Sequence, residues 1–78
     1  MFARMKRQTP KLKLGDAIRQ ERKKLGISQE QFAELSGFHR TYIGHVERGE
    51  KNITVGGLLK IAKALKLTGS DLLTKAKL

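Results

Sequence analysis

The sequence predicts an all-α fold of five short helices, and three observations support this. Residues that begin a helix well recur along the chain, apolar residues follow them at spacings of three or four, and no segment alternates as a β-strand would. The chain of 78 residues is long enough for one small hydrophobic core. We therefore expect a single helical domain over residues 10–78, preceded by a flexible basic arm over residues 1–9.

The first helix is expected to begin with Thr9 as its N-cap and Pro10 at its first position. Leu14 and Ile18 follow at helical spacing, and Gly26 ends the helix.

The second helix has the densest set of start signals. Ser28 is placed as N-cap and Gln31 stands three residues later, which is the spacing of a capping box. The helix should run from Gln29 to about Ser36, with Gly37 supplying the left-handed turn.

The third helix is predicted over about residues 40–48, with Gly49 ending it. Only Ile43 and Val46 are aliphatic, and at about 100° per residue they share one side of the helix. The other side gathers hydrogen-bond donors, cations and a glycine: Arg40, Thr41, Gly44, His45 and Arg48. A helix with so narrow an apolar side presents most of its surface outward.

Two further helices complete the predicted fold. Thr54 caps the fourth, whose apolar stripe comprises Val55, Leu58, Ile61, Ala62 and Leu65. Thr68 and Asp71 form a capping pair ahead of a short fifth helix.

The charge of the chain predicts a polyanionic partner. Seventeen Lys and Arg residues against seven Asp and Glu residues give a net charge of +10, and nine of those cations lie within residues 1–24. Arginine and threonine on the outward side of the third helix suit guanine acceptors and the thymine methyl group in the DNA major groove. Double-stranded DNA is therefore the first candidate partner.

The composition gives no support for catalysis. There is no cysteine, and the two histidines, His39 and His45, lack both the spacing and the carboxylate neighbours of a zinc site. We expect no enzyme activity, no metal and no cofactor. No apolar run approaches a membrane span or a secretory signal, so we expect a cytoplasmic protein that associates with the nucleoid when bound to DNA.

The segment "QEQFAELSGFHRTYIGHVER", residues 29–48, resembles the helix-turn-helix of the lambda-repressor-like (Cro/cI, Xre) family. Ala33 stands where the two helices nearly touch, Gly37 lies in the turn, and Ile43 and Val46 hold the recognition helix. The resemblance extends from about Lys13 to Leu73. It implies a compact five-helix DNA-binding domain that acts as a homodimer on a pseudo-palindromic operator.

The resemblance also implies roles for individual residues. The base contacts fall on Arg40, Thr41, Gly44 and His45, and the phosphate contacts on Gln29, Arg48, Lys51 and Asn52. Arg22 and Glu47 match positions at which relatives form a partly buried ion pair.

Within the family, "HRTYIGHVERGEKNIT" is most similar to controllers of restriction–modification systems, although the long basic head departs from that pattern. An antitoxin or a phage-type repressor would carry the same helices. A nonspecific nucleic-acid-binding protein would also account for the charge, but it would call for more aromatic stacking residues.

The C-terminal segment supplies the expected dimer interface, formed by Leu72, Leu73, Ala76 and Leu78. We expect one of the two adjacent leucines to close the core of the monomer instead. We expect no small-molecule effector.

Overall fold

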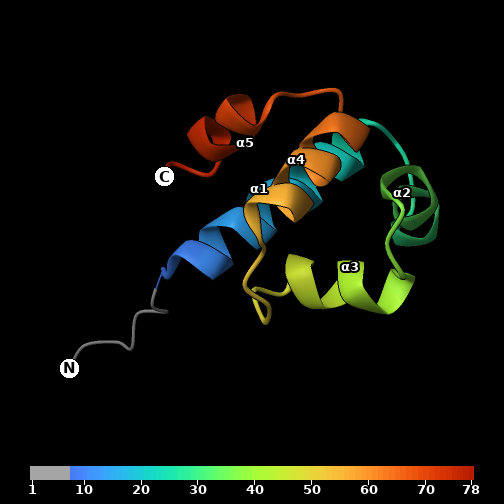
Figure 1. Cartoon of the computed structure of the whole chain (residues 1–78), viewed down its shortest axis with the longest axis horizontal. Coiled ribbons are helices and arrows are strands. Elements are labelled where there is room, and N and C mark those ends of the chain that lie inside the picture. The colour runs from blue at the N-terminus through green and yellow to red at the C-terminus, as the bar shows by residue number, and fades with distance from the viewer. Residues whose placement is uncertain (1–7) are drawn as a thin grey trace.

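The computed structural model describes residues 8–78, which form five helices and no strand (Figure 1). The helices are α1 (Pro10–Lys24), α2 (Gln29–Ser36), α3 (Arg40–Glu47), α4 (Val55–Ala64) and α5 (Gly69–Lys75). Residues 1–7, and with them most of the predicted basic arm, lie outside the described residues.

The helices pack as a closed ring, in the order α1, α3, α2, α4, α5 and back to α1. In Figure 1, α3 lies along the lower edge of the molecule, α2 rises beside it, and α5 lies at the opposite end. The helix-turn-helix pair, α2 and α3, therefore occupies one side of the ring, and α5 closes the other.

Each helix contributes at least one large, fully buried side chain to the core. These are Ile18 from α1, Phe32 from α2, Ile43 and Val46 from α3, Ile61 from α4 and Leu72 from α5. Burying large apolar side chains is the main stabilising contribution in a domain of this size. α3 itself packs mainly against α1 and α2, and α4 and α5 close the ring around the same core.

The helix starts confirm the predicted capping residues. The side chains of Thr9, Ser28, Thr54 and Thr68 each accept a hydrogen bond from a backbone N–H in the first turn of their helix. Ser28 with Gln31, and Thr68 with Asp71, form complete capping boxes. Gly37 has a φ of 80°, the left-handed conformation expected of the turn between α2 and α3.

α3 runs from Arg40 to Glu47 with Arg48 as its C-cap, which agrees with the predicted extent of about residues 40–48. One detail of the predicted helices is corrected. Val55 does not join the buried apolar stripe of α4, since it is 74% exposed at the first position of the helix.

Candidate nucleic-acid interface

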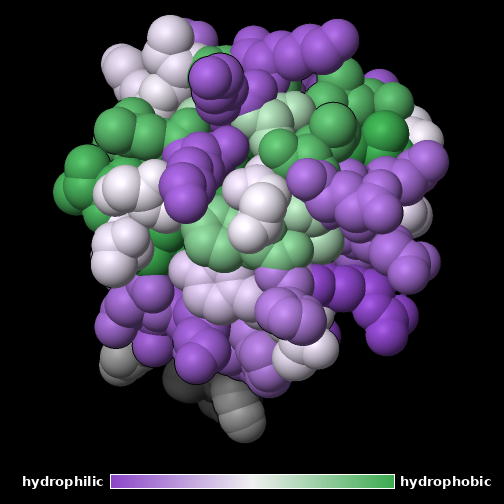
Figure 2. Space-filling view, turned by 45° about the vertical axis from the view of Figure 1, so that its right-hand side comes forward, coloured by the Kyte–Doolittle hydropathy of each residue, from purple (hydrophilic) through white to green (hydrophobic). Residues whose placement is uncertain are grey.

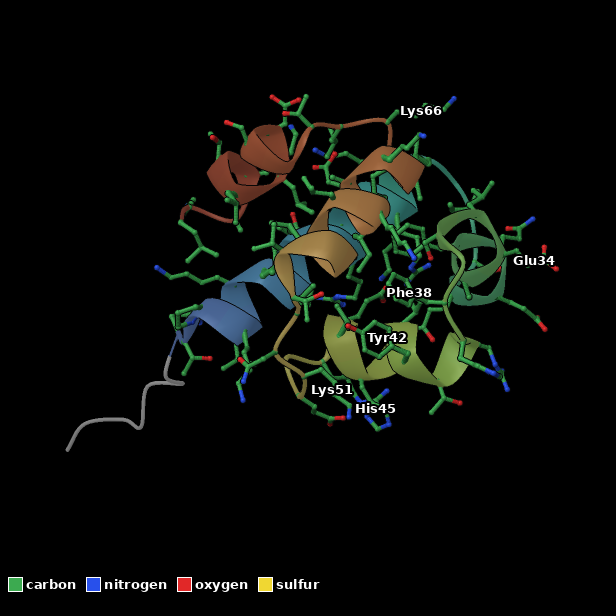
Figure 3. The ribbon with its side chains drawn as sticks, in the orientation of Figure 1. Glu34, Phe38, Tyr42, His45, Lys51 and Lys66 are labelled. Carbon is green, nitrogen blue, oxygen red and sulfur yellow. The ribbon has the colours of Figure 1, made fainter. Side chains whose placement is uncertain are left out.

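The outward side of α3 carries the side chains that the sequence assigns to DNA contact. Arg40, Thr41 and Arg48 are exposed, and the side chain of His45 is 38% exposed. Lys51 and Asn52 are exposed in the loop that follows. Figure 3 shows His45 and Lys51 projecting from the same side of the molecule, away from the helices that complete the ring.

The opposite side of α3 is fixed by apolar contacts. Ile43 is fully buried and Val46 is 2% exposed, which confirms their predicted role in docking the helix. The rings of Phe38 and Tyr42 lie 4.8 Å apart, and the Lys60 ammonium group of α4 lies 5.6 Å from the centre of the Phe38 ring. These contacts tie the start of α3 to α4.

A buried carboxylate fixes the end of α3. Arg22 donates to Glu47 through Nε, 2.6 Å from Oε2, and through Nη2, 3.0 Å from Oε1, so the predicted ion pair is present and bidentate. Gln29 Nε2 donates to the same Glu47 Oε1 at 3.0 Å. The Glu47 side chain is only 1% exposed, and this cluster joins α1, α2 and α3.

Gly44 has different surroundings from those expected of a helix surface open to DNA. It is buried, and a Cβ atom at this position would lie 3.2 Å from Nη1 of Arg48 and 3.7 Å from Oε1 of Gln29. The missing side chain therefore makes room for Gln29 and Arg48 to lie across the helix. Of the four predicted base contacts, only Arg40, Thr41 and His45 present side chains outward.

Gly15, in the middle of α1, is a positioning residue that the sequence analysis missed. A Cβ atom here would collide with the backbone carbonyl oxygen of Val46 and would lie 2.9 Å from that of Glu47. The signal in the sequence was a glycine in a helix interior, which costs about 1 kcal/mol relative to alanine and therefore needs a packing reason. That reason is the close approach of α1 to the end of α3.

Glu50 is a second missed residue, and it lies among the predicted DNA contacts. It accepts hydrogen bonds from Arg48 Nε at 3.1 Å and Arg48 Nη2 at 3.2 Å, and its Oε1 lies 2.7 Å from His45 Nδ1. All three side chains are exposed by more than a third. Hydrogen bonds from Arg48 and then His45 lower the pKa of Glu50 to about 2.

The predicted dimer interface is corrected at two of its four residues. Leu72 is fully buried and Ala76 is 4% exposed, because this side of α5 faces the core beside α1 and α4. Leu73 is partly exposed and Leu78 is 51% exposed. As expected, one of the two adjacent leucines closes the core, and it is Leu72.

The distribution of surface polarity follows this arrangement. In Figure 2 the lower part of the molecule, where α3 lies, is mostly hydrophilic, and the exposed apolar side chains lie higher.

Among residues 8–78, no group of three or more His, Cys, Asp or Glu side chains could hold a metal ion. None of the described helices has both the length and the apolar character needed to cross a membrane.

The fold and the exposed side of α3 define a helix-turn-helix protein, and the comparison with known families agrees. The helix-turn-helix family model matches residues 18–72, which is most of the chain. The chain therefore belongs to the helix-turn-helix family of DNA-binding transcriptional regulators, which are not enzymes.

Two similar proteins are a control protein and a restriction–modification controller protein. The chain is 50% identical over 62 residues to the control protein C.SmaI of Serratia marcescens, a match that covers 80% of this chain and 74% of that protein. The crystal structure of the restriction–modification controller protein C.AhdI from Aeromonas hydrophila is 43% identical, with a TM-score of 0.76 over 78% of this chain and 92% of that one.

The DNA-binding domain of a repressor shares the same architecture. The DNA-binding domain of the P22 c2 repressor is 35% identical, with a TM-score of 0.74 over 77% of this chain and 79% of that one. The predicted lambda-repressor-like fold is thus confirmed.

Proposed function

We propose that the protein is a sequence-specific double-stranded DNA-binding regulator of transcription, which acts as a homodimer on a pseudo-palindromic operator. One observation carries the proposal. The buried Ile43 and Val46 dock α3 onto the core, while Arg40 and Thr41 on its other side are exposed. The major groove of B-DNA is wide enough to admit an α-helix with such side chains.

The contacts divide into two kinds. Arg40, Thr41 and His45 read base edges, and Arg40 bidentate to a guanine is the most discriminating of these contacts. Phosphates are held by Gln29 at the start of α2 and by the exposed Arg48, Lys51 and Asn52 after α3. Residues 10–78 form the DNA-binding domain, and the cations of residues 1–9 add sequence-independent attraction.

We assign the protein to the controllers of restriction–modification systems. We also propose that it is cytoplasmic and associates with the nucleoid when it is bound to DNA. The similarity to C.SmaI and C.AhdI supports this assignment over an antitoxin or a phage-type repressor. A restriction enzyme gene and a methyltransferase gene beside the coding sequence would support the assignment, and a neighbouring toxin gene would contradict it.

The test of DNA recognition is selection of bound duplexes from a random DNA pool at near-physiological salt. The expected result is one enriched two-fold site with half-sites about one helical turn apart. Equal recovery of all sequences would overturn the proposal and favour a nonspecific nucleic-acid-binding protein.

The proposed dimer interface is the exposed apolar surface of α4 and α5, formed by Val55, Leu59, Leu73 and Leu78. Val55, Leu59 and Leu78 are 74%, 54% and 51% exposed. Leu59 packs against Gly69 of α5, where a Cβ atom would lie 2.9 Å from Leu59 Cδ2, so α4 and α5 meet at this side chain. Exposed apolar side chains on so small a chain mark a surface that a partner covers.

Leu59→Glu should shift the protein from dimer to monomer in sedimentation, because it places a charge in that surface. Leu35→Glu is the matched control, since Leu35 is 63% exposed on α2 and is not part of the proposed interface. Equal sedimentation of the two variants would place the interface elsewhere.

A further inference from the structure

Glu50 is a carboxylate held against two hydrogen-bonding side chains of the proposed DNA-reading surface, those of Arg48 and His45. Its two oxygens bind the Nε and Nη2 atoms of Arg48 in a fork, and Oε1 also meets His45 Nδ1 at 2.7 Å. We call these three residues the Glu50 cluster. The adjacent hollow is also lined by Asp16 and Arg19, which already pair with each other at 2.7 Å.

The Glu50 carboxylate uses the same donors that a DNA phosphate would use. The fork of an arginine side chain binds carboxylate and phosphate oxygens with the same two-point geometry. Arg48 cannot give both Nε and Nη2 to Glu50 and to a phosphate at the same time. A phosphate that binds Arg48 through this fork must therefore displace Glu50.

The contact with His45 fixes the hydrogen-bonding direction of that side chain. An ionised carboxylate has no proton to donate, so the 2.7 Å contact requires the proton to be on His45 Nδ1. With Nδ1 protonated, the 3.3 Å contact between Arg48 Nη2 and Nδ1 is not a hydrogen bond. Arg48 and His45 are instead held together by their shared acceptor.

We propose that Glu50 competes with DNA phosphate for Arg48 and thereby lowers the affinity for nonspecific DNA. The competition acts on every sequence, whereas base contacts by α3 are made only at the operator. Glu50 therefore lowers the affinity for the operator and for random DNA by the same factor, and it acts as an affinity-limiting residue that leaves their ratio unchanged. This inference rests on the proposed function of α3.

The Glu50 carboxylate carries its negative charge at ordinary pH. Because Arg48 and His45 lower the pKa of Glu50 to about 2, the carboxylate loses its charge only as the pH falls through that value. The exposure of the cluster also matters, because all three side chains can exchange partners with an incoming phosphate without unfolding any helix.

The test compares Glu50→Gln with Glu34→Gln, which changes the net charge by the same amount. Glu34 is exposed on α2, and Figure 3 shows it pointing away from the side that carries His45. Affinity for a random-sequence duplex is measured by fluorescence anisotropy over a range of salt concentrations. A second readout is the ¹⁵N spectrum of the His45 imidazole in the free protein.

Glu50→Gln is expected to bind the random duplex about fivefold more tightly at 0.15 M salt, with a salt slope steeper by about 0.9, as one more phosphate is neutralised. Glu34→Gln should stay close to the wild type. The ¹⁵N spectrum should show a proton on His45 Nδ1 in the wild type and in Glu34→Gln.

Two results would overturn the inference. Equal nonspecific binding by the two variants would mean that only net charge matters, and weaker binding by Glu50→Gln would mean that Glu50 supports the contact. Failure of the proposed function is distinguishable, because it would appear as a wild-type protein that selects no site from the random pool.

Discussion

The buried and exposed carboxylates at the end of α3 have the same chemistry but different consequences. Glu47 binds the Nε and Nη2 atoms of Arg22 and one further donor from Gln29, and Glu50 binds the same two atoms of Arg48 and one further donor from His45. The side chain of Glu47 is 1% exposed and that of Glu50 is 49% exposed.

Burial accounts for the difference between the two clusters. A charge that has lost its water must keep its partners, so the Glu47 cluster fixes three helices in one arrangement. Exposed ion pairs are screened by water and exchange readily, so the Glu50 cluster contributes little to folding and stays open to a competing ion. We expect the first cluster to govern stability and the second to govern binding.

The largest effect is expected when one partner of the buried cluster is removed. Arg22→Ala should lower the free energy of unfolding by about 3–5 kcal/mol, because it leaves Glu47 buried without its counter-ion. Urea denaturation followed by circular dichroism measures this change. The double variant Arg22→Met/Glu47→Leu should recover most of the loss, and no recovery would contradict the desolvation argument.

A smaller effect is expected from the close approach that supports the buried cluster. Gly15→Ala should destabilise the protein by about 1–3 kcal/mol, because the added methyl group forces α1 away from the backbone of Val46 and Glu47. Gly56→Ala is the matched control, since an added Cβ there meets only Thr54 Oγ1 at 4.0 Å. Thermal unfolding of both variants decides the point, and equal melting temperatures would refute the proposed contact.

On the exposed side, substitution should alter binding without altering the fold. Arg40→Ala should reduce discrimination between the selected operator and random DNA by about 1–3 kcal/mol, because one bidentate base contact is lost. Competition binding at fixed salt measures the ratio. Lys51→Ala should instead weaken binding to all sequences alike, and an unchanged ratio for Arg40→Ala would mean that α3 does not read the bases.

The smallest effect on stability is expected at the exposed carboxylate itself. Glu50→Ala should leave the midpoint of urea unfolding unchanged, because both partners remain solvated when the carboxylate is removed. A midpoint shifted as far as that of Arg22→Ala would show that the two clusters do not differ in the way that their burial implies.

Features set by near neighbours in the chain were predictable from the sequence. Capping by Thr9, Ser28 and Thr68, and the left-handed turn at Gly37, depend on contacts within about one helical turn, so residue types at fixed spacings suffice. The family pattern added the pairing of Arg22 with Glu47, which are 25 residues apart.

Tertiary packing decided the features that depend on how the helices meet. Gly15 is required because α1 crosses the end of α3 at that point, and Leu72 faces inward because α5 closes the ring of helices. Helical periodicity gives the relative angles of side chains on one helix, but it does not say which angle a neighbouring helix covers.

The exposed cluster was missed for a different reason, since its three residues lie within five positions of one another in the chain. The sequence by itself determined the five helices, the docking side of α3 and the charge that suits DNA. Only the tertiary structure decided the close approach of α1 at Gly15 and the inward side of α5. The contacts of Glu50 with His45 and Arg48 are local, because the left-handed turn at Gly49, with a φ of 75°, folds the loop back onto the helix. Such a return of the chain depends on backbone conformation at one residue, which periodicity does not encode.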